Sequence, residues 1–296
     1  MTDRQRRILL VAHAHREDAH VLAREVAARL EAAGIDVRAL TEDSPDDAAD
    51  GCELVVVLGG DGTILRGAEV ARASGGVPVL GVNLGHVGFL AEAEREDLGA
   101  TVDHIVRRDW AAEERLAIEV RVSADGRTIW SSWALNEASV EKASRERMLD
   151  LAIEIDGRPL STWGCDGVVL ATPTGSTAYA FSGGGPVVWP QVDAMLLVPI
   201  SAYALFARPL VLAPTTHIAV EVVPSNEGVG VLWCDGRRSF ALPNGARVEV
   251  VRSDIPVRLA RLRPGAFTDR LVAKFDLSTV GWRGAPRPET RVGTGS

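Results

Sequence analysis

The sequence predicts an α/β domain followed by a domain of antiparallel β-strands. In the first part of the chain, short apolar runs rich in β-branched residues alternate with amphipathic segments, which is the pattern of a mostly parallel sheet covered by helices. From Trp110 onward, short runs with approximate apolar alternation are separated by Asp-Gly and Asn-Gly turns, as is typical of antiparallel strands. The 296 residues are enough for two cores. We therefore expect domains at residues 1–108 and 109–264.

The first domain is expected to hold four strands and three helices. Apolar runs predict strands over residues 7–12, 35–40, 53–58 and 77–81. Helical spacing of apolar residues predicts a helix over 17–33 that stops at Gly34, a second that Thr63 caps and that ends near Ser74, and a closing helix over 93–108.

The remainder of the chain predicts further strands and one returning helix. Alternating patterns predict strands over residues 116–122, 128–134, 151–155, 217–223 and 247–252. Residues 269–275 look helical, and we expect the segment 265–282 to fold back onto the first domain. Residues 283–296 are rich in Gly, Pro and Arg, which predicts a disordered tail.

A glycine-rich turn, Leu58 to Thr63, separates the third predicted strand from the helix that follows it. A turn of this kind at the carboxyl end of a parallel strand presents backbone N–H groups that can hold phosphate. The expected phosphate-binding residues are Gly59, Gly60, Gly62 and Thr63. Asp61 is the unusual member, because a carboxylate repels phosphate; it must meet a metal ion, act as a base, or simply stabilise the turn.

A second stretch rich in glycine and hydroxyl residues runs from Gly164 to Pro186. This composition is unsuited to a core strand and predicts a loop that wraps a polar ligand, with Tyr179 as a flat stacking surface. The alternative is a long flexible linker, against which stand the apolar residues on both sides of the stretch.

Composition excludes several classes of partner. The hydrophobic share of 46%, the charged share of 24% and the net charge of −8 are those of a soluble protein without a general surface for nucleic acid or anionic membranes. No run reaches the roughly 20 apolar residues of a membrane span, and no signal peptide is recognisable. Lys142 and Lys274 are the only lysines, so no Walker-type motif is possible. The cysteines Cys52, Cys165 and Cys234 lack CxxC spacing, which predicts a reduced cytoplasmic protein without structural zinc.

Three motifs in order carry a family resemblance. They are Gly-Gly-Asp-Gly-Thr at 59–63, Asn136-Glu137, and Asp166-Gly followed by Thr-Pro-Thr-Gly-Ser-Thr-Ala-Tyr at 172–179. Together they resemble the NAD kinases, and the sequence as a whole is most similar to actinobacterial members of that family. Lipid kinases share the first motif, whereas the third is far more specific.

This resemblance implies phosphoryl transfer from ATP, in some members also from polyphosphate, to the adenosine ribose 2′-hydroxyl of NAD, giving NADP. It implies an α/β domain, a β-sandwich domain, a C-terminal return to the first domain, and a homodimer or homotetramer. Because the chain has no P-loop lysine, the amides of the glycine turn, a helix dipole and a divalent cation such as Mg²⁺ must neutralise the triphosphate. We expect this cation to be held mainly by the donor phosphates, with no metal site on the protein itself.

The resemblance also assigns roles to single residues. Asp61 matches the proton acceptor, and Asp61, Gly62 and Arg66 match a loop that contacts the dinucleotide. The expected nucleotide contacts further along the chain are Asn136, Glu137, Asp166 and, around the adenine, Thr177, Ala178, Tyr179, Ala180, Phe181 and Ser182. Three positions of variable identity complete the expected set, namely Arg147, Gly164 (through its backbone) and Arg237.

The chemistry of the residues agrees with this resemblance. A ribose hydroxyl is a poor nucleophile, and a carboxylate within hydrogen-bond reach can accept its proton, a contribution of about 10²–10⁴-fold. Asp61 is our candidate for that base, and holding the metal is the alternative. A kinase acting on a lipid or sugar phosphate, and a dinucleotide sensor without activity, are the competing functions; a dehydrogenase is not supported, because the chain has no early Gly-x-Gly-x-x-Gly.

Overall fold

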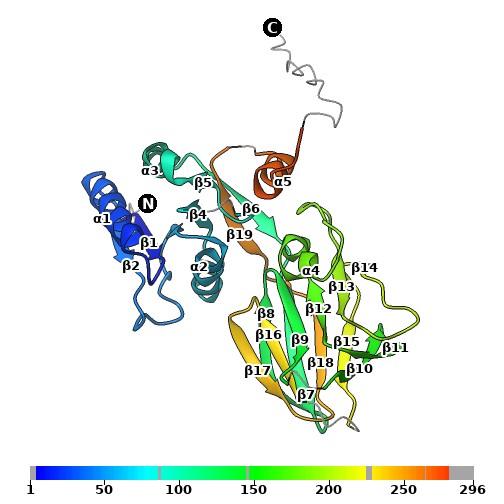
Figure 1. The fold of residues 1–296 in the computed structure, drawn as a ribbon. Coiled ribbons are helices and arrows are strands. Elements are labelled where there is room, and N and C mark those ends of the chain that lie inside the picture. Colours follow the sequence, from blue (N-terminus) through cyan, green and yellow to red (C-terminus); the bar gives the residue numbers. More distant parts are fainter. Residues whose placement is uncertain (1–4, 86–87, 145–146, 225–228, 264, 280–296) are drawn as a thin grey trace.

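The computed structural model describes residues 5–85, 88–144, 147–224, 229–263 and 265–279. The described chain forms one half built on a mostly parallel sheet and one half built on two antiparallel sheets (Figure 1). Two strands that lie side by side, β6 and β19, run from one half toward the other. This arrangement is the α/β-plus-β fold that the sequence predicts.

The first sheet has the strand order β2-β1-β3-β4-β19-β6, with β5 beside β4. Every pairing is parallel except that of β6 with β19. Its strands are β1 (Arg7–Ala12), β2 (Asp36–Ala39), β3 (Leu54–Leu58), β4 (Val79–Asn83), β5 (Ala93–Glu94), β6 (Ala111–Arg115) and β19 (Val257–Arg261).

Helices cover both faces of this sheet. Alternate residues of a strand point to opposite faces, so Leu9 and Val11 pack with helix α2 (Asp61–Ala73), while Ile8 and Leu10 pack with helices α1 (Glu17–Ala32) and α3 (Leu98–Arg107). The expected closing helix over 93–108 begins only at Leu98, because strand β5 and a 3₁₀ turn (Arg95–Asp97) precede it. The expected strand over 77–81 lies two residues later, as β4.

Strands β6 and β19 join the first sheet, although the expected boundary at residue 108 places both in the second domain. Val257 and Leu259 pack into the core on the α2 side of the sheet, and Ala260 packs into the core on the other side. A strand buried on both faces belongs in the middle of a parallel sheet. The chain therefore leaves the first sheet after β6 and returns to it at β19.

The second half is a sandwich of two antiparallel sheets with the orders β11-β10-β15-β18-β7-β8 and β14-β13-β12-β9-β16-β17. The first contains β7 (Ile118–Ala124), β8 (Arg127–Ala134), β10 (Leu149–Ile155), β11 (Arg158–Cys165), β15 (Ile218–Val222) and β18 (Arg247–Arg252). The second contains β9 (Glu137–Lys142), β12 (Gly167–Ala171), β13 (Met195–Ile200), β14 (Leu210–Leu212), β16 (Gly230–Cys234) and β17 (Arg238–Leu242). One cluster of buried side chains from both sheets fills the space between them.

Strand β12 corrects the interpretation of the second glycine-rich stretch. Its five residues are buried in the centre of a sheet, whereas the whole of 164–186 was expected to be a ligand-wrapping loop. The run Val168 to Leu170 supplies the apolar side chains of a core strand. Gly167 permits the close pairing, because a Cβ there would come within about 2.5 Å of the Val140 carbonyl oxygen.

Helix α5 (Phe267–Phe275) returns to the first domain, as expected. The ring of Phe89, in the loop after β4, lies 5.9 Å from the rings of Phe267 and Phe275. Phe275 also lies 4.8 Å from Phe181 of the second domain, so α5 contacts both halves. Residues 280–282 of the returning segment and the expected disordered tail at 283–296 lie outside the described residues.

Candidate active site

The glycine turn follows β3 directly and opens helix α2 at the carboxyl edge of the first sheet. Gly60 is the residue before the helix, and Asp61 is its first residue. The expected cap, Thr63, is wrong: it lies inside the first turn, where its N–H donates to the carbonyl oxygen of Gly60 at 2.9 Å. The Gly59 N–H donates to the Val82 carbonyl at 3.0 Å. The N–H groups of Asp61 and Gly62, the first two of the helix, precede the helical hydrogen-bond ladder, and with the helix dipole they favour an anion.

The carboxylate of Asp61 holds the neighbouring loop. Its Oδ2 accepts the N–H of Phe89 at 3.0 Å, and its Oδ1 accepts the N–H of Leu90 at 3.2 Å. A side chain at Gly88 would overlap with the Asp61 carboxylate, so a glycine is required for this approach. Each carboxylate oxygen has two acceptor positions, and half-buried Asp61 can therefore accept a further donor.

Asn136 and Glu137 lie where β8 passes into β9, and a single carboxylate orders their backbone. Asp235, in the tight turn between β16 and β17, accepts the N–H groups of Leu135 at 2.9 Å, Asn136 at 2.7 Å and Glu137 at 3.3 Å. Asp235 adopts a φ of 53°, and Gly236 follows with 62°; with Arg237 they form the three-residue connection between the paired residues Cys234 and Arg238. The sequence identified this turn but gave Asp235 no role at the site.

The Glu137 carboxyl is buried with 8% of the residue exposed. Burial and the nearby Asp235 raise the pKa of Glu137 to about 8. The N–H of Tyr179 donates to its Oε2 at 3.4 Å. A carboxyl group that keeps its proton near neutral pH can donate a hydrogen bond as well as accept one.

The segment after β12 is ordered, which excludes the flexible linker. It forms a 3₁₀ turn (Thr174–Thr177) and the short helix α4 (Tyr179–Ser182). It sits directly on Asn136, whose carbonyl oxygen accepts the N–H of Thr172 at 2.9 Å. A side chain at Gly175 would overlap with that same carbonyl.

Several hydroxyl groups of this segment donate to backbone carbonyl groups, either of the segment itself or of Leu135 beside it. Thr172 donates to the Leu135 carbonyl, Ser176 to the Pro173 carbonyl at 2.7 Å, and Thr177 to the Thr174 carbonyl at 3.2 Å. These bonds fix the shape of the loop.

The residues expected around the adenine, Thr177 to Ser182, differ in how deeply they are buried. Ala180 is completely buried in an apolar cluster, whereas Phe181 is 41% exposed and Ser182 is exposed. The Tyr179 phenol bonds Glu141, and burial together with Glu141 raises the pKa of Tyr179. Thr177 and Tyr179 are half-buried at the surface of the segment, as is Ala178.

Asp166 and Gly164 lie around the end of β11. The Asp166 carboxylate pairs with Lys142, which lowers the pKa of Asp166. The Gly164 carbonyl accepts the N–H of Tyr203 at 2.8 Å. Arg147 is exposed in the connection before β10.

Glu69 of α2 joins the two halves of the site. Its carboxylate lies 3.1 Å from Arg237 Nε and 3.2 Å from Arg238 Nε, and 3.8 Å from Arg66 Nη1. Arg238 in turn donates to Asp235 at 2.9 Å. The structure thereby connects the helix that begins at Asp61 with the turn that orders Asn136 and Glu137. Glu69 was missed by the sequence analysis, because a glutamate on an amphipathic helix carries no local signal of such a role.

An aromatic ring, that of Trp133, also contacts both α2 and β17 at this junction between the two domains. The guanidinium groups of Arg72 from α2 and Arg238 from β17 both lie over the ring of Trp133 of β8, each 4.6 Å from its centroid. Within the described residues, no cluster of three or more His, Cys, Asp or Glu side chains could hold a metal ion. None of the described helices is long and apolar enough to cross a membrane.

Comparison with known proteins matches both halves of the chain to one family. Residues 38–110 match the ATP-NAD kinase N-terminal domain, and residues 135–262 match the ATP-NAD kinase C-terminal domain. NAD kinase 2 of Streptomyces coelicolor is 57% identical over 299 residues, covering 96% of this chain and 99% of that protein. The NAD kinase of Thermobifida fusca is 58% identical over 301 residues, covering 94% and 92%.

Two solved structures share the fold. Yeast NADH kinase complexed with NADH superposes with a TM-score of 0.81 at 25% identity, covering 97% of this chain and 90% of that one. An NAD kinase from Archaeoglobus fulgidus in complex with ATP gives a TM-score of 0.71 at 25% identity, covering 92% and 98%.

Proposed function

This chain belongs to the NAD kinase family, and we propose that Asp61 is the general base with which it phosphorylates NAD. The reaction transfers a phosphoryl group from ATP to NAD and yields NADP. The observation that carries the proposal for Asp61 is its position. It is the first residue of α2 in the glycine turn, and its carboxylate is fixed by the N–H groups of Phe89 and Leu90.

The acceptor in this proposal is the adenosine ribose 2′-hydroxyl of NAD. Asp61 accepts its proton as the bond between the ribose oxygen and the γ-phosphorus forms, while the bond from that phosphorus to the bridging oxygen of ATP breaks and ADP leaves. Phosphoryl transfer passes through a loose transition state, so alignment and charge compensation supply most of the catalysis. The N–H groups at the start of α2, preceded by Gly59 and Gly60, stabilise charge on the donor phosphates together with the helix dipole.

The nucleotide is held from the second domain. Asn136 and Glu137 lie on a backbone that Asp235 fixes, and the Glu137 carboxyl can hydrogen-bond a hydroxyl in either direction. We assign the adenine end to the surface of the segment Thr177–Ser182, where Ala180 acts only through its backbone because its side chain is buried. Asp166 contacts the ribose or nicotinamide end in this proposal.

Five further positions complete the proposed NAD site. Gly62 lies in the first turn of α2 beside Asp61, with open space where a side chain would stand. Arg66 and Arg237 converge on Glu69 at the junction of the two domains. Arg147 and Gly164 contact the ligand from the edge of the sandwich, Gly164 through its backbone.

A divalent cation, Mg²⁺, supplies charge neutralisation of the donor phosphates when bound. The residues present fit a cation carried mainly by those phosphates. The one acidic side chain on the glycine turn, Asp61, already accepts two N–H groups and keeps only part of its coordination free. In this proposal Asp61 serves as the base, and polyphosphate can replace ATP as the donor.

We also propose that the enzyme is a homodimer or homotetramer that acts in the cytoplasm. Tyr203 is 86% exposed and Phe206 53% exposed, and Leu205 between them is fully exposed. An apolar loop of this kind favours contact with a second copy. Its first residue is tied to Gly164 of the proposed site. The cysteines carry no disulfide, as in reducing compartments.

The test is formation of NADP from NAD by the purified full-length protein, with ATP and polyphosphate supplied separately. Wild-type protein is expected to form NADP with ATP, while Asp61→Asn forms almost none. Equal turnover in the two proteins would disprove the assignment of Asp61. NADP formation with polyphosphate and no ATP would show that polyphosphate is a second phosphoryl donor. Light scattering of the same sample gives the mass of the assembly.

A further inference from the structure

A hollow lies where the end of β19 meets the start of β6, and neither the glycine turn nor Asn136 and Glu137 line it. It has a volume of about 530 Å³ and is bounded by the start of β6, the end of β19, helix α5 and the segment Pro190-Gln191 of the second domain. None of the residues assigned to NAD lines it.

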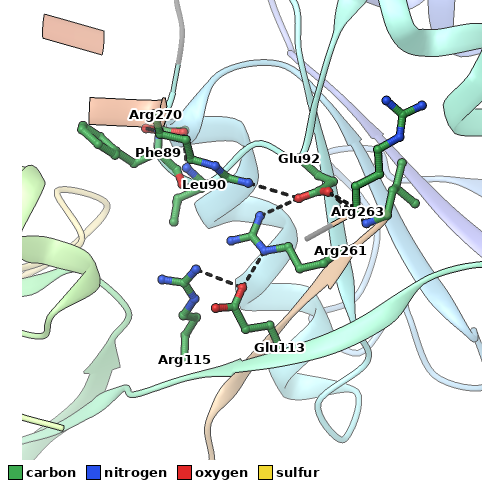
Figure 2. A network of polar contacts seen from close by, with 10 residues as sticks. Phe89, Leu90, Glu92, Glu113, Arg115, Arg261, Arg263 and Arg270 are labelled. Carbon is green, nitrogen blue, oxygen red and sulfur yellow. Dashed lines mark hydrogen bonds and ion pairs between the residues drawn. The ribbon is translucent and has the colours of Figure 1, made fainter. Parts of the chain in front are cut away.

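Three arginines and two glutamates form an ion-pair network at its wall (Figure 2). Arg261 bridges Glu92 at 3.0 Å and Glu113 at 2.6 Å. Arg270 of α5 pairs with Glu92 at 3.1 Å, and Arg115 pairs with Glu113 at 3.0 Å. Three cations therefore share two anions, which leaves a surplus of one positive charge.

Two members of this network are almost completely buried. Arg115 has 6% of its surface exposed and Glu92 only 6% of its side chain. Among the described residues, Arg115 bonds Glu113 alone, and its buried Nε finds no hydrogen-bond partner. Burial and the charge of Arg261 lower the pKa of Arg115 to about 10. A buried cation that lacks a full set of partners destabilises the fold unless an anion compensates it.

The rest of the lining favours an organic or condensed anion over a single small ion. Trp110 and Phe267 supply aromatic surface, and Arg108 and Arg263 add cationic groups at the rim. Arg108 is already paired with Glu53 at 2.9 Å. The volume exceeds what one phosphate ion fills, and guanidinium groups bind the oxygens of phosphate in pairs.

We propose that this hollow is a second anion site, which takes a phosphate-bearing ligand of the pyrophosphate class on Arg115, Arg261 and Arg270. The bound anion compensates the surplus charge and ties α5 to the first sheet. The site is connected to the glycine turn through Arg270, which donates to the Phe89 carbonyl at 2.8 Å. Phe89 is the residue whose N–H holds Asp61.

The experiment is calorimetric titration of the full-length protein with inorganic pyrophosphate, in the absence of NAD and ATP. Its outcome is therefore independent of catalysis. Arg115→Gln removes one cation of the network and is expected to weaken binding about tenfold or more. Arg258→Gln is the matched control, because Arg258 lies on β19, the strand that pairs with β6 of Arg115, forms an ion pair with Glu114 and does not line the hollow. It should bind as the wild type does.

A second variant and a second anion complete the experiment. Arg263→Gln changes an exposed residue at the rim, so it remains informative if Arg115→Gln fails to fold, and it should weaken binding a few-fold. Citrate, a carboxylate anion of similar charge, tests the ligand class. The proposal is overturned if pyrophosphate does not bind, or if wild type, Arg115→Gln and Arg263→Gln bind it with equal affinity. It is also overturned if citrate binds more tightly than pyrophosphate.

Discussion

The carboxylate of Asp61 and the backbone N–H of Phe89 are joined by a hydrogen bond of 3.0 Å, across 28 residues of sequence. This bond links the loops that follow two neighbouring strands, β3 and β4. Asp61 thus has a structural partner as well as a catalytic assignment, and a substitution there must be interpreted with both in mind.

Asp61→Asn should separate these roles. The amide cannot accept a proton, so kcat is expected to fall about 10²–10⁴-fold, while KM for NAD changes little. One amide oxygen can replace only one of the two carboxylate acceptors, so a modest loss of thermal stability should accompany the change. Steady-state kinetics and NAD calorimetry measure the two effects. A mutant whose NAD affinity collapses while kcat persists would assign Asp61 to binding.

Glu137 should make stability depend on pH. Its pKa is about 8 in the folded protein, compared with an ordinary value of 4.5. The folded state therefore binds its proton more tightly than the unfolded state does. The resulting stabilisation is complete below about pH 4.5, declines as the pH rises, and is lost above about pH 8.

Glu137→Gln cannot ionise, so its free energy of unfolding should vary less than that of the wild type across this range. At about pH 9 the variant should be the more stable by about 1 kcal/mol or more, since one pKa unit corresponds to about 1.4 kcal/mol. Urea denaturation at a series of pH values measures this. Glu114→Gln, at an exposed glutamate, is the control. Parallel profiles for wild type and Glu137→Gln would contradict the raised pKa.

Asp235→Asn should disturb the NAD site without touching the ligand. The carboxylate accepts N–H groups from Leu135, Asn136 and Glu137, and an amide retains one acceptor atom for them. We expect a loss of about 1–3 kcal/mol in the free energy of unfolding and a higher KM for NAD.

Asp156→Asn is a close structural control for this change. Asp156 has a φ of 51°, is followed by a glycine, and accepts the N–H of His217 at 2.8 Å in an exposed turn. Asparagine tolerates the same backbone conformation, so this variant should lose less than about 1 kcal/mol and keep its KM. Similar effects of the two substitutions would show that the turn, and not the bonds to Asn136 and Glu137, matters.

Local patterns were sufficient to predict much of this protein. The strand, glycine turn and helix around Asp61 are contiguous, and their apolar pattern and glycines specify them without reference to the rest of the chain. Strands β7, β8, β10, β15 and β18 were found because tight turns separate runs with approximate apolar alternation. The family resemblance then supplied the reaction.

The features that could not be predicted depend on contacts between residues far apart in the sequence. Strand β19 enters the first sheet by pairing Leu259 with Val79 and with Glu113, which lie far away in sequence. The contacts of Asp235 with Asn136 span 99 residues, and no spacing rule signals them. The network of Arg115, Arg261 and Arg270 is equally non-local. An interdomain junction of this kind becomes visible only when the strands are placed.

Gly175→Ala tests how closely the third motif must approach Asn136. A Cβ at Gly175 would overlap with the Asn136 carbonyl, which is backbone and has little room to move. We expect a loss of about 1–3 kcal/mol in the free energy of unfolding, with a higher KM for NAD, because Asn136 must shift. Gly62→Ala is the stability control, since open space surrounds that position in α2, and alanine there should gain up to about 1 kcal/mol. Thermal unfolding of both variants measures the difference. Equal stability would mean that the loop at Gly175 retreats without cost, and that its contact with Asn136 does not fix the nucleotide site.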